Sequence, residues 1–203
     1  MVELLVYSVL SVVILTISGG MLIMSINTRV QITDISQMTS TGQLIAVSVQ
    51  EGVRNASGTG GATADTGIKT EDSAADGSQL MRARVAVGAE NGLIAWRCQA
   101  WFYSAETEAV YMAISDAGAI EDPVTFSVSN DVHTAAAGTA NWTLLGDGVR
   151  RVPPNAFFST GSSEKKVTLR FEMQRKDVSL VLIPSTIVKR SIVAGGTGPT
   201  ACY

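Results

Sequence analysis

The sequence predicts an α+β protein in which one long N-terminal helix packs on an antiparallel β-sheet. Two observations predict this fold class. Residues 4–26 form an apolar run that continues, without a proline or a turn cluster, into an amphipathic pattern, and residues 80–188 contain short β-favouring segments separated by turns. A chain of 203 residues suits one membrane-proximal element and one globular domain.

The apolar run reads LLVYSVLSVVILTISGGMLIMSI, and the only charged residue before its end is Glu3. A helix needs about 20 apolar residues to cross the hydrocarbon core of a bilayer. A signal peptide has a shorter apolar core that follows a basic start, so length and charge both favour a membrane-spanning helix.

The helical pattern continues after Arg29, where apolar residues recur at spacings of mostly three and four with polar residues between them. The apolar positions are Val30, Ile32, Ile35, Met38, Gly42, Ile45, Val49 and Val53. We therefore expect one helix of about 50 residues, near 75 Å long at about 1.5 Å per residue. Its first half is apolar all round, and its second half packs one face against the globular domain.

Gly19 and Gly20 lie inside the apolar half. A glycine in a helix interior costs about 1 kcal/mol relative to alanine, so this pair is a candidate site for helix flexibility, either bending or local melting.

The chain divides into three parts. Residues 1–54 form the helix, residues 55–79 form a variable loop rich in Gly, Ala, Ser, Thr and Asp, and residues 80–203 form the sheet domain with a C-terminal tail. The strands are expected at residues 81–87, 92–104, 109–115, 124–128, 142–145 and 167–173, and less clearly at 179–188 because Pro184 interrupts that segment. The first three form an antiparallel meander whose first turn contains Asn91-Gly92.

The two cysteines are Cys98, in an aromatic strand, and Cys202, at the end of a Gly-rich tail that is otherwise expected to be flexible. A disulfide between them is the simplest use of such a pair in an oxidising compartment. It would close a loop of about 100 residues, which contributes roughly 4–5 kcal/mol in the chain-entropy model. The alternative is a buried free Cys98 and an exposed free Cys202.

Catalytic and cofactor motifs are weak or missing in the sequence. No Gly-Lys-Ser/Thr phosphate loop is present, His133 is the only histidine, and no Gly-x-Ser-x-Gly turn supplies a nucleophile. One histidine and two distant cysteines do not match a zinc pattern. We therefore expect no enzyme activity, no catalytic residues, no cofactor and no metal.

Two surface interpretations stay open. Trp96, Trp101 and Phe102 form either part of the core, which strand spacing favours, or an aromatic binding face. Arg150-Arg151 and residues 164–166 are small charge clusters typical of solvated turns, although folding could unite them in a basic patch. The net charge of −3, without a basic block, gives no nucleic-acid footprint at the level of the whole chain.

The opening MVELLVYSVLSVVILTISGG resembles the N-terminus of bacterial type IV pilins and of the pseudopilins of type II secretion. Their mature chains begin with a segment of the form Phe-Thr-Leu-Ile-Glu-Leu-Leu, and residues 1–6, MVELLV, are similar to its Leu-Ile-Glu-Leu-Leu-Val part. The resemblance is specific over roughly the first thirty residues and extends over the rest only as a pilin-like architecture.

The resemblance implies a mechanism. Subunits wait in the cytoplasmic membrane, are cleaved and N-methylated by a prepilin peptidase, and are added by the pilus assembly machinery to an extracellular fimbrial filament, a helical homopolymer of identical or related pilin subunits. Glu3 matches the family's assembly acid, which neutralises the terminal amine of a neighbouring subunit. That acid lies at the fifth mature position in the family, so we expect the mature terminus to lie just upstream of Met1.

The role within this class stays open between major pilin, minor pilin and secretion pseudopilin. A hypothesis from another class is a single-pass, membrane-anchored surface binding module, an adhesin or DNA receptor, that uses the aromatic strand or residues 55–78. A third, a membrane-tethered hydrolase, would need His133.

Overall fold

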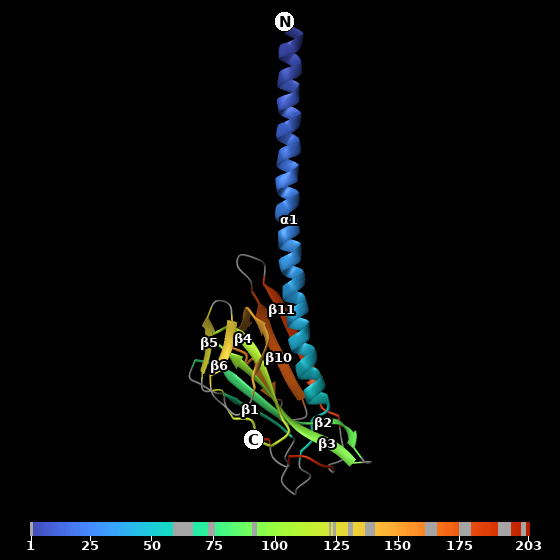
Figure 1. Cartoon of the computed structure of the whole chain (residues 1–203), viewed down its shortest axis with the longest axis vertical. Coiled ribbons are helices and arrows are strands. Elements are labelled where there is room, and N and C mark those ends of the chain that lie inside the picture. The colour runs from blue at the N-terminus through green and yellow to red at the C-terminus, as the bar shows by residue number, and fades with distance from the viewer. Residues whose placement is uncertain are drawn as a thin grey trace.

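A single long helix, α1 (Val2–Arg54), projects far beyond the β-sheets that pack against its C-terminal half (Figure 1). The structure is a computed structural model, and it describes residues 2–58, 67–72, 76–90, 93–121, 123, 125–129, 132–136, 141–160, 166–174, 180–190, 196–199 and 202–203. The predicted fold class, a long N-terminal helix on antiparallel β-structure, is confirmed.

The strands form three sheets within these residues. Their bounds are β1 (Ile68–Asp72), β2 (Gln79–Glu90), β3 (Leu93–Ser104), β4 (Ala109–Ser115), β5 (Thr125–Ser129), β6 (Val132–Ala136), β7 (Thr143–Asp147), β8 (Val149–Arg151), β9 (Phe158–Thr160), β10 (Lys166–Met173) and β11 (Val181–Val188). The five-stranded sheet has the order β1-β2-β3-β4-β7, β10 lies between β11 and both β8 and β9, and β5 pairs with β6. Every pairing between these strands is antiparallel.

The buried stripe of α1 starts at Met38 rather than at Val30. Its buried residues are Met38, Gly42, Ile45, Val49, Gly52 and Val53. The predicted amphipathic pattern is therefore confirmed over the last four turns of the helix. The three earlier apolar positions, Val30, Ile32 and Ile35, are exposed because no sheet reaches them.

Two glycines let α1 approach the sheets closely. A Cβ on Gly52 would lie 2.0 Å from Cη2 of Trp101 in β3, and one on Gly42 would lie 1.9 Å from Cδ1 of Ile183 in β11. The Trp101 indole N–H donates to the Ser48 hydroxyl at 2.9 Å. The helix is thus held between the two larger sheets by contacts that only small residues permit.

Most of the predicted strands are confirmed, and the meander is β2-β3-β4. The prediction of a loop over residues 55–79 needs a correction, because residues 68–72 form strand β1, whose Ile68 is buried and pairs with Ala83 of β2. Strands β6, β8 and β9 were not predicted, since each is short and carries little apolar alternation.

The strands after residue 148, β8 to β11, build a sheet of their own rather than extend the first one. Gly148 makes this change of sheet possible. Its φ is +66°, and a Cβ there would lie 2.4 Å from the carbonyl oxygen of Gln174. Glycine adopts this backbone without strain, so the chain can pass directly from β7 to β8.

The five-stranded sheet is buried on both faces. The face toward α1 shares one core with the β8–β11 sheet, and this core includes Trp101, Val110, Leu169 and Phe171. The other face packs a second core around Leu80, Cys98, Phe102, Tyr111 and Cys202. Trp96, Trp101 and Phe102 are all buried, which confirms the core interpretation over an aromatic binding face.

The C-terminal tail is held in place where the structure describes it, by the bridge and by further contacts that were not predicted. Cys202 is bonded to Cys98, as predicted. Thr197 exchanges backbone hydrogen bonds with β3, donating to the Ile94 carbonyl at 2.8 Å and accepting from the Trp96 N–H at 2.9 Å.

Arg84 adds a second attachment for the tail. It lies over the Trp96 ring with its guanidinium carbon 4.1 Å from the ring centroid, and its Nε donates to the Pro199 carbonyl at 2.8 Å. Its Nη1 donates to the Gly58 carbonyl at 3.2 Å, so Arg84 joins the tail to the segment that follows α1.

Candidate functional site

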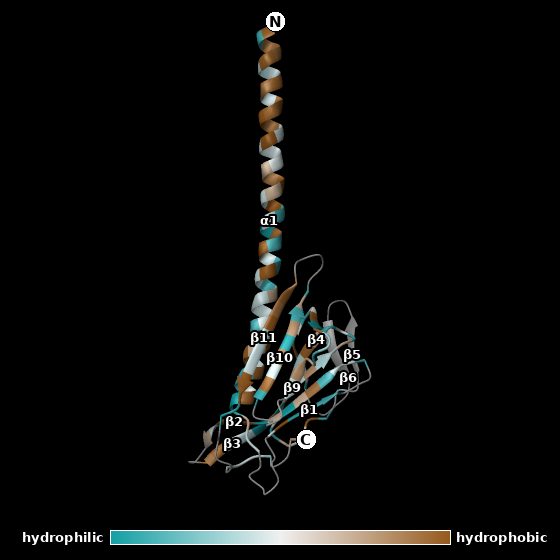
Figure 2. Cartoon of the chain, turned by 180° about the vertical axis from the view of Figure 1, so that it is seen from behind, coloured by the Kyte–Doolittle hydropathy of each residue, from teal (hydrophilic) through white to brown (hydrophobic). Residues whose placement is uncertain are grey.

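The N-terminal half of α1, from Val2 to Ile26, is the most unusual surface of the molecule, and we call it the bare half or the rod. Every large apolar residue from Val2 to Ile26 is at least half exposed, with Val2 and Leu4 exposed to 77% and 76%. Figure 2 shows this half as a nearly continuous hydrophobic rod away from the sheets. A surface of this size is unfavourable in water and marks an interaction with lipid or with other apolar surfaces.

Three hydroxyl side chains on this rod and just beyond it bond to the helix's own backbone. The hydroxyls of Ser8, Thr16 and Thr28 donate to the carbonyls of Leu5, Val12 and Met24 at 2.9, 2.5 and 2.9 Å. Such internal bonds remove the cost of burying a hydroxyl away from water. By length and composition α1 is able to cross a membrane, and its surface chemistry suits either a bilayer or a bundle of helices.

Glu3 lies in the first turn of α1 and is exposed. It is the only charged residue before Arg29. An acid in the first turn interacts favourably with the positive end of the helix dipole, typically by 0.3–1 kcal/mol. This gain is small compared with the several kcal/mol that burying an unpaired carboxylate costs, so Glu3 needs a partner once the rod is buried beside another apolar surface.

Gly19 and Gly20 lie within the unbroken helix, and a Cβ built on either one meets nothing within 4 Å. No packing contact with the described residues therefore requires glycine there. The proposed role of the pair in helix flexibility stays a prediction.

The packed half of α1 carries a second, partly apolar stripe. Leu44, Val47, Ser48 and Glu51 line an open groove of about 440 Å³ beside β2 and β3. Leu44 and Val47 are about half exposed. The helix thus continues to present apolar surface alongside the domain, on a different side from the residues that it buries.

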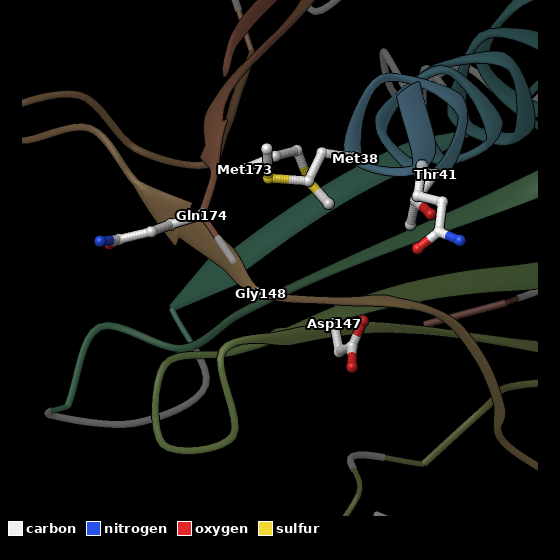
Figure 3. A pocket seen from close by; sticks show the side chains of 7 residues that line it. Met38, Thr41, Asp147, Gly148, Met173 and Gln174 are labelled. Carbon is white, nitrogen blue, oxygen red and sulfur yellow. The ribbon is translucent and has the colours of Figure 1, made fainter. Parts of the chain in front are cut away.

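A small cavity marks the point where α1 leaves the domain. Its volume is about 60 Å³, and it is lined by Gln37, Met38, Thr41, Asp147, Gly148, Met173 and Gln174. Figure 3 shows Met38 and Met173 turned toward each other across it. Drug-sized ligands occupy pockets of about 300–1,000 Å³, so this cavity is a junction between the helix and the sheets rather than a ligand site.

Within the part of the chain that the structure describes, no group of three or more His, Cys, Asp or Glu side chains could hold a metal ion. His133 falls in strand β6, and its side chain lies outside the described residues. Arg150 in β8 and Lys166 in β10 belong to the same sheet, but Arg150 lies opposite Glu172, six residues along β10 from Lys166, and its Nε pairs with Glu108 Oε1 at 2.7 Å.

Comparisons of the chain with models of protein families, with curated proteins and with solved structures found no match. The architecture is compatible with a pilin-like protein anchored in a membrane by its N-terminal helix.

Proposed function

We propose that this chain is a structural subunit of a type IV pilus-like filament and is not an enzyme. The observation that carries the proposal is the bare half of α1, a long apolar rod with one acid, Glu3, at its outer end. Before assembly the rod is held in the cytoplasmic membrane. After processing by a prepilin peptidase, it leaves the lipid and packs against the rods of other subunits in an extracellular filament.

Lipid and a packed bundle of helices accommodate most side chains of the rod equally well, but they differ in how they accommodate Glu3. Apolar side chains are satisfied equally by lipid tails and by neighbouring helices. A carboxylate at the membrane edge can reach water, whereas inside a packed bundle it requires an opposite charge. The terminal ammonium of a neighbouring subunit supplies that charge and fixes the register between subunits.

The exposed stripe with Leu44 and Val47 supports the same proposal, because it extends the contact surface beyond the rod to the level of the globular domain. The burial of Trp96, Trp101 and Phe102 weighs against the alternative of a surface receptor that binds through the aromatic strand.

The experiment is to express Glu3→Ala in the native cell and to measure the chain in the sheared filament fraction and in the membrane fraction. The variant leaves a neighbour's ammonium buried without its partner, which costs about 3–5 kcal/mol. We therefore expect filament yield to fall more than about a hundredfold, while the membrane fraction keeps the chain.

Asp34→Ala is the matched control, since it removes an acid from the same helix close to where the sheets begin, and it should leave filaments intact. Normal filament yield with Glu3→Ala would contradict the proposal and favour a simple membrane anchor for a surface binding module.

A further inference from the structure

The sequence contains two Asn-x-Ser/Thr tripeptides, and the proposed function uses neither of them. They are Asn55-Ala56-Ser57, which follows α1, and Asn141-Trp142-Thr143, which leads into β7. In this pattern the asparagine side-chain amide accepts an oligosaccharide, and the hydroxyl-bearing residue two positions later is required for recognition. Because so short a pattern often arises by chance, accessibility decides whether either tripeptide can act as an acceptor.

The first tripeptide is closed by its own packing. Ala56 and Ser57 are only 0% and 4% exposed. The Ser57 N–H donates to the Arg84 carbonyl at 2.9 Å, and the Asn55 carbonyl accepts from the Ala86 N–H at 2.9 Å. These contacts hold the tripeptide against β2 and bury its hydroxyl-bearing residue. Asn55 is therefore a poor acceptor once the domain has folded.

The second tripeptide is open. Asn141 and Thr143 are both exposed, whereas Trp142 between them is partly buried against the second core. The Trp142 ring meets the Phe102 ring edge to face, with the two ring centroids 6.2 Å apart. Trp142 therefore anchors the tripeptide to the domain, while the amide-bearing and hydroxyl-bearing residues that flank it stay accessible to solvent.

The position of the second tripeptide in the fold also suits a bulky group. Thr143 begins β7 and lies opposite Met112 of β4, and Asn141 lies just before the strand, outside any helix or strand. In the order β1-β2-β3-β4-β7, β7 is the last strand of its sheet, so Asn141 lies at the margin of the sheet. N-linked oligosaccharides are bulky and occupy surface positions of this kind.

We propose that Asn141 is an N-glycosylation site and that it is modified in the folded domain, whereas Asn55 is not. The co-reactant is a lipid-phosphate-linked oligosaccharide. The Asn141 side-chain nitrogen Nδ2 forms a bond to the anomeric carbon of the first sugar and loses one proton. The bond between that carbon and the phosphate oxygen breaks, and the lipid phosphate leaves with the electron pair. No oxidant or reductant is needed.

This proposal goes beyond the proposed function and does not require filaments. It needs only that the globular domain lies outside the cytoplasm. The disulfide between Cys98 and Cys202 supports that placement, because such bonds persist in oxidising compartments. Glycosylation and assembly can therefore be tested separately.

The test is mass spectrometry of the full chain isolated from the membrane fraction of its native cell, as the intact chain and after digestion. In the wild type, the peptide that contains Asn141 should carry the added mass of a chain of sugars, and the peptide that contains Asn55 should not. Asn141→Gln should remove the added mass from the intact chain. Thr143→Ala should remove it equally although Asn141 is still present, and Thr143→Ser should retain it, because serine also supplies the hydroxyl.

Asn55→Gln is the matched control, since it removes the amide of the buried tripeptide, and it should leave the added mass unchanged. An unmodified Asn141 peptide in the wild type would overturn the proposal, and so would sugars that persist in Asn141→Gln. Sugars on Asn55 would also overturn it, because they would show that the modification precedes the folding that buries Ser57.

Discussion

The two halves of α1 both carry apolar side chains, but the surroundings of these side chains are very different. From Met38 to Val53 one stripe is buried between two sheets and contains glycines at the closest contacts, whereas from Val2 to Ile26 every large apolar residue is exposed. In the packed half the chain itself supplies the partner. In the bare half the partner must come from lipid or from another molecule, so the contrast identifies the surface on which the proposed function depends.

The largest expected effect within the packed region comes from removing its disulfide. Replacing both Cys98 and Cys202 with alanine releases a loop spanning a sequence separation of 104 residues. The chain-entropy model gives a loss of roughly 4–5 kcal/mol in the free energy of unfolding. Thermal unfolding of the full chain in detergent measures the loss.

Membrane insertion of the bare half should be unchanged in the same variant, because the rod makes no contact with the bridge. Loss of membrane association in the double alanine variant would contradict the independence of the two regions.

A smaller effect on stability distinguishes the two halves when the same substitution, glycine to alanine, is made in each of them. Gly52→Ala puts a methyl group into the Trp101 ring, and overpacking of this kind costs about 1–3 kcal/mol. Gly20→Ala meets open space and adds up to about 1 kcal/mol of helix propensity. Gly52→Ala should therefore lower the free energy of unfolding of the domain, whereas Gly20→Ala should not lower it, and equal destabilisation would mean that the bare half is packed in the monomer.

The smallest effect is a pH dependence confined to the sheets. The hydrogen bond from Lys69, followed by the interaction with Arg82, holds the pKa of Glu71 below its ordinary value despite the opposing effect of burial. Because the folded-state pKa is lowered, the stabilisation is present above the unfolded-state pKa of about 4.3 and is lost as the pH falls through the folded-state value.

Glu71→Gln should therefore lower the free energy of unfolding by about 0.5 kcal/mol at neutral pH, since the pair is partly exposed. The difference from wild type should vanish in acid. A difference that persists unchanged at low pH would show that packing, rather than charge, is lost in Glu71→Gln.

Much of the division between the bare half of α1 and the packed domain could be predicted from the sequence, because helix and strand periodicities are local signals. The apolar run, its amphipathic continuation, the β2-β3-β4 meander and the bridge between the cysteines were all predicted. The start of the buried stripe could not be predicted, since Val30 and Met38 have equal apolar character and only the reach of the sheets distinguishes them.

The features that were missed depend on contacts between distant segments. The change of sheet at Gly148 depends on the Gln174 carbonyl, and the attachment of the tail depends on Arg84 lying opposite Cys98 in the β2-β3 register. No local pattern encodes these meetings.

The most direct test of the central claim is site-specific photo-cross-linking of the full chain in its native cell. A photoreactive residue at Leu10, in the bare half, should give adducts between copies of this chain. The photoreactive residue placed at Leu44, beside the groove of the packed half, reports whether contacts between copies extend to the domain. Placed at Ile45, which is buried in its own domain, it should give no adducts between copies. Adducts at Ile45, or only lipid adducts at Leu10, would contradict the account.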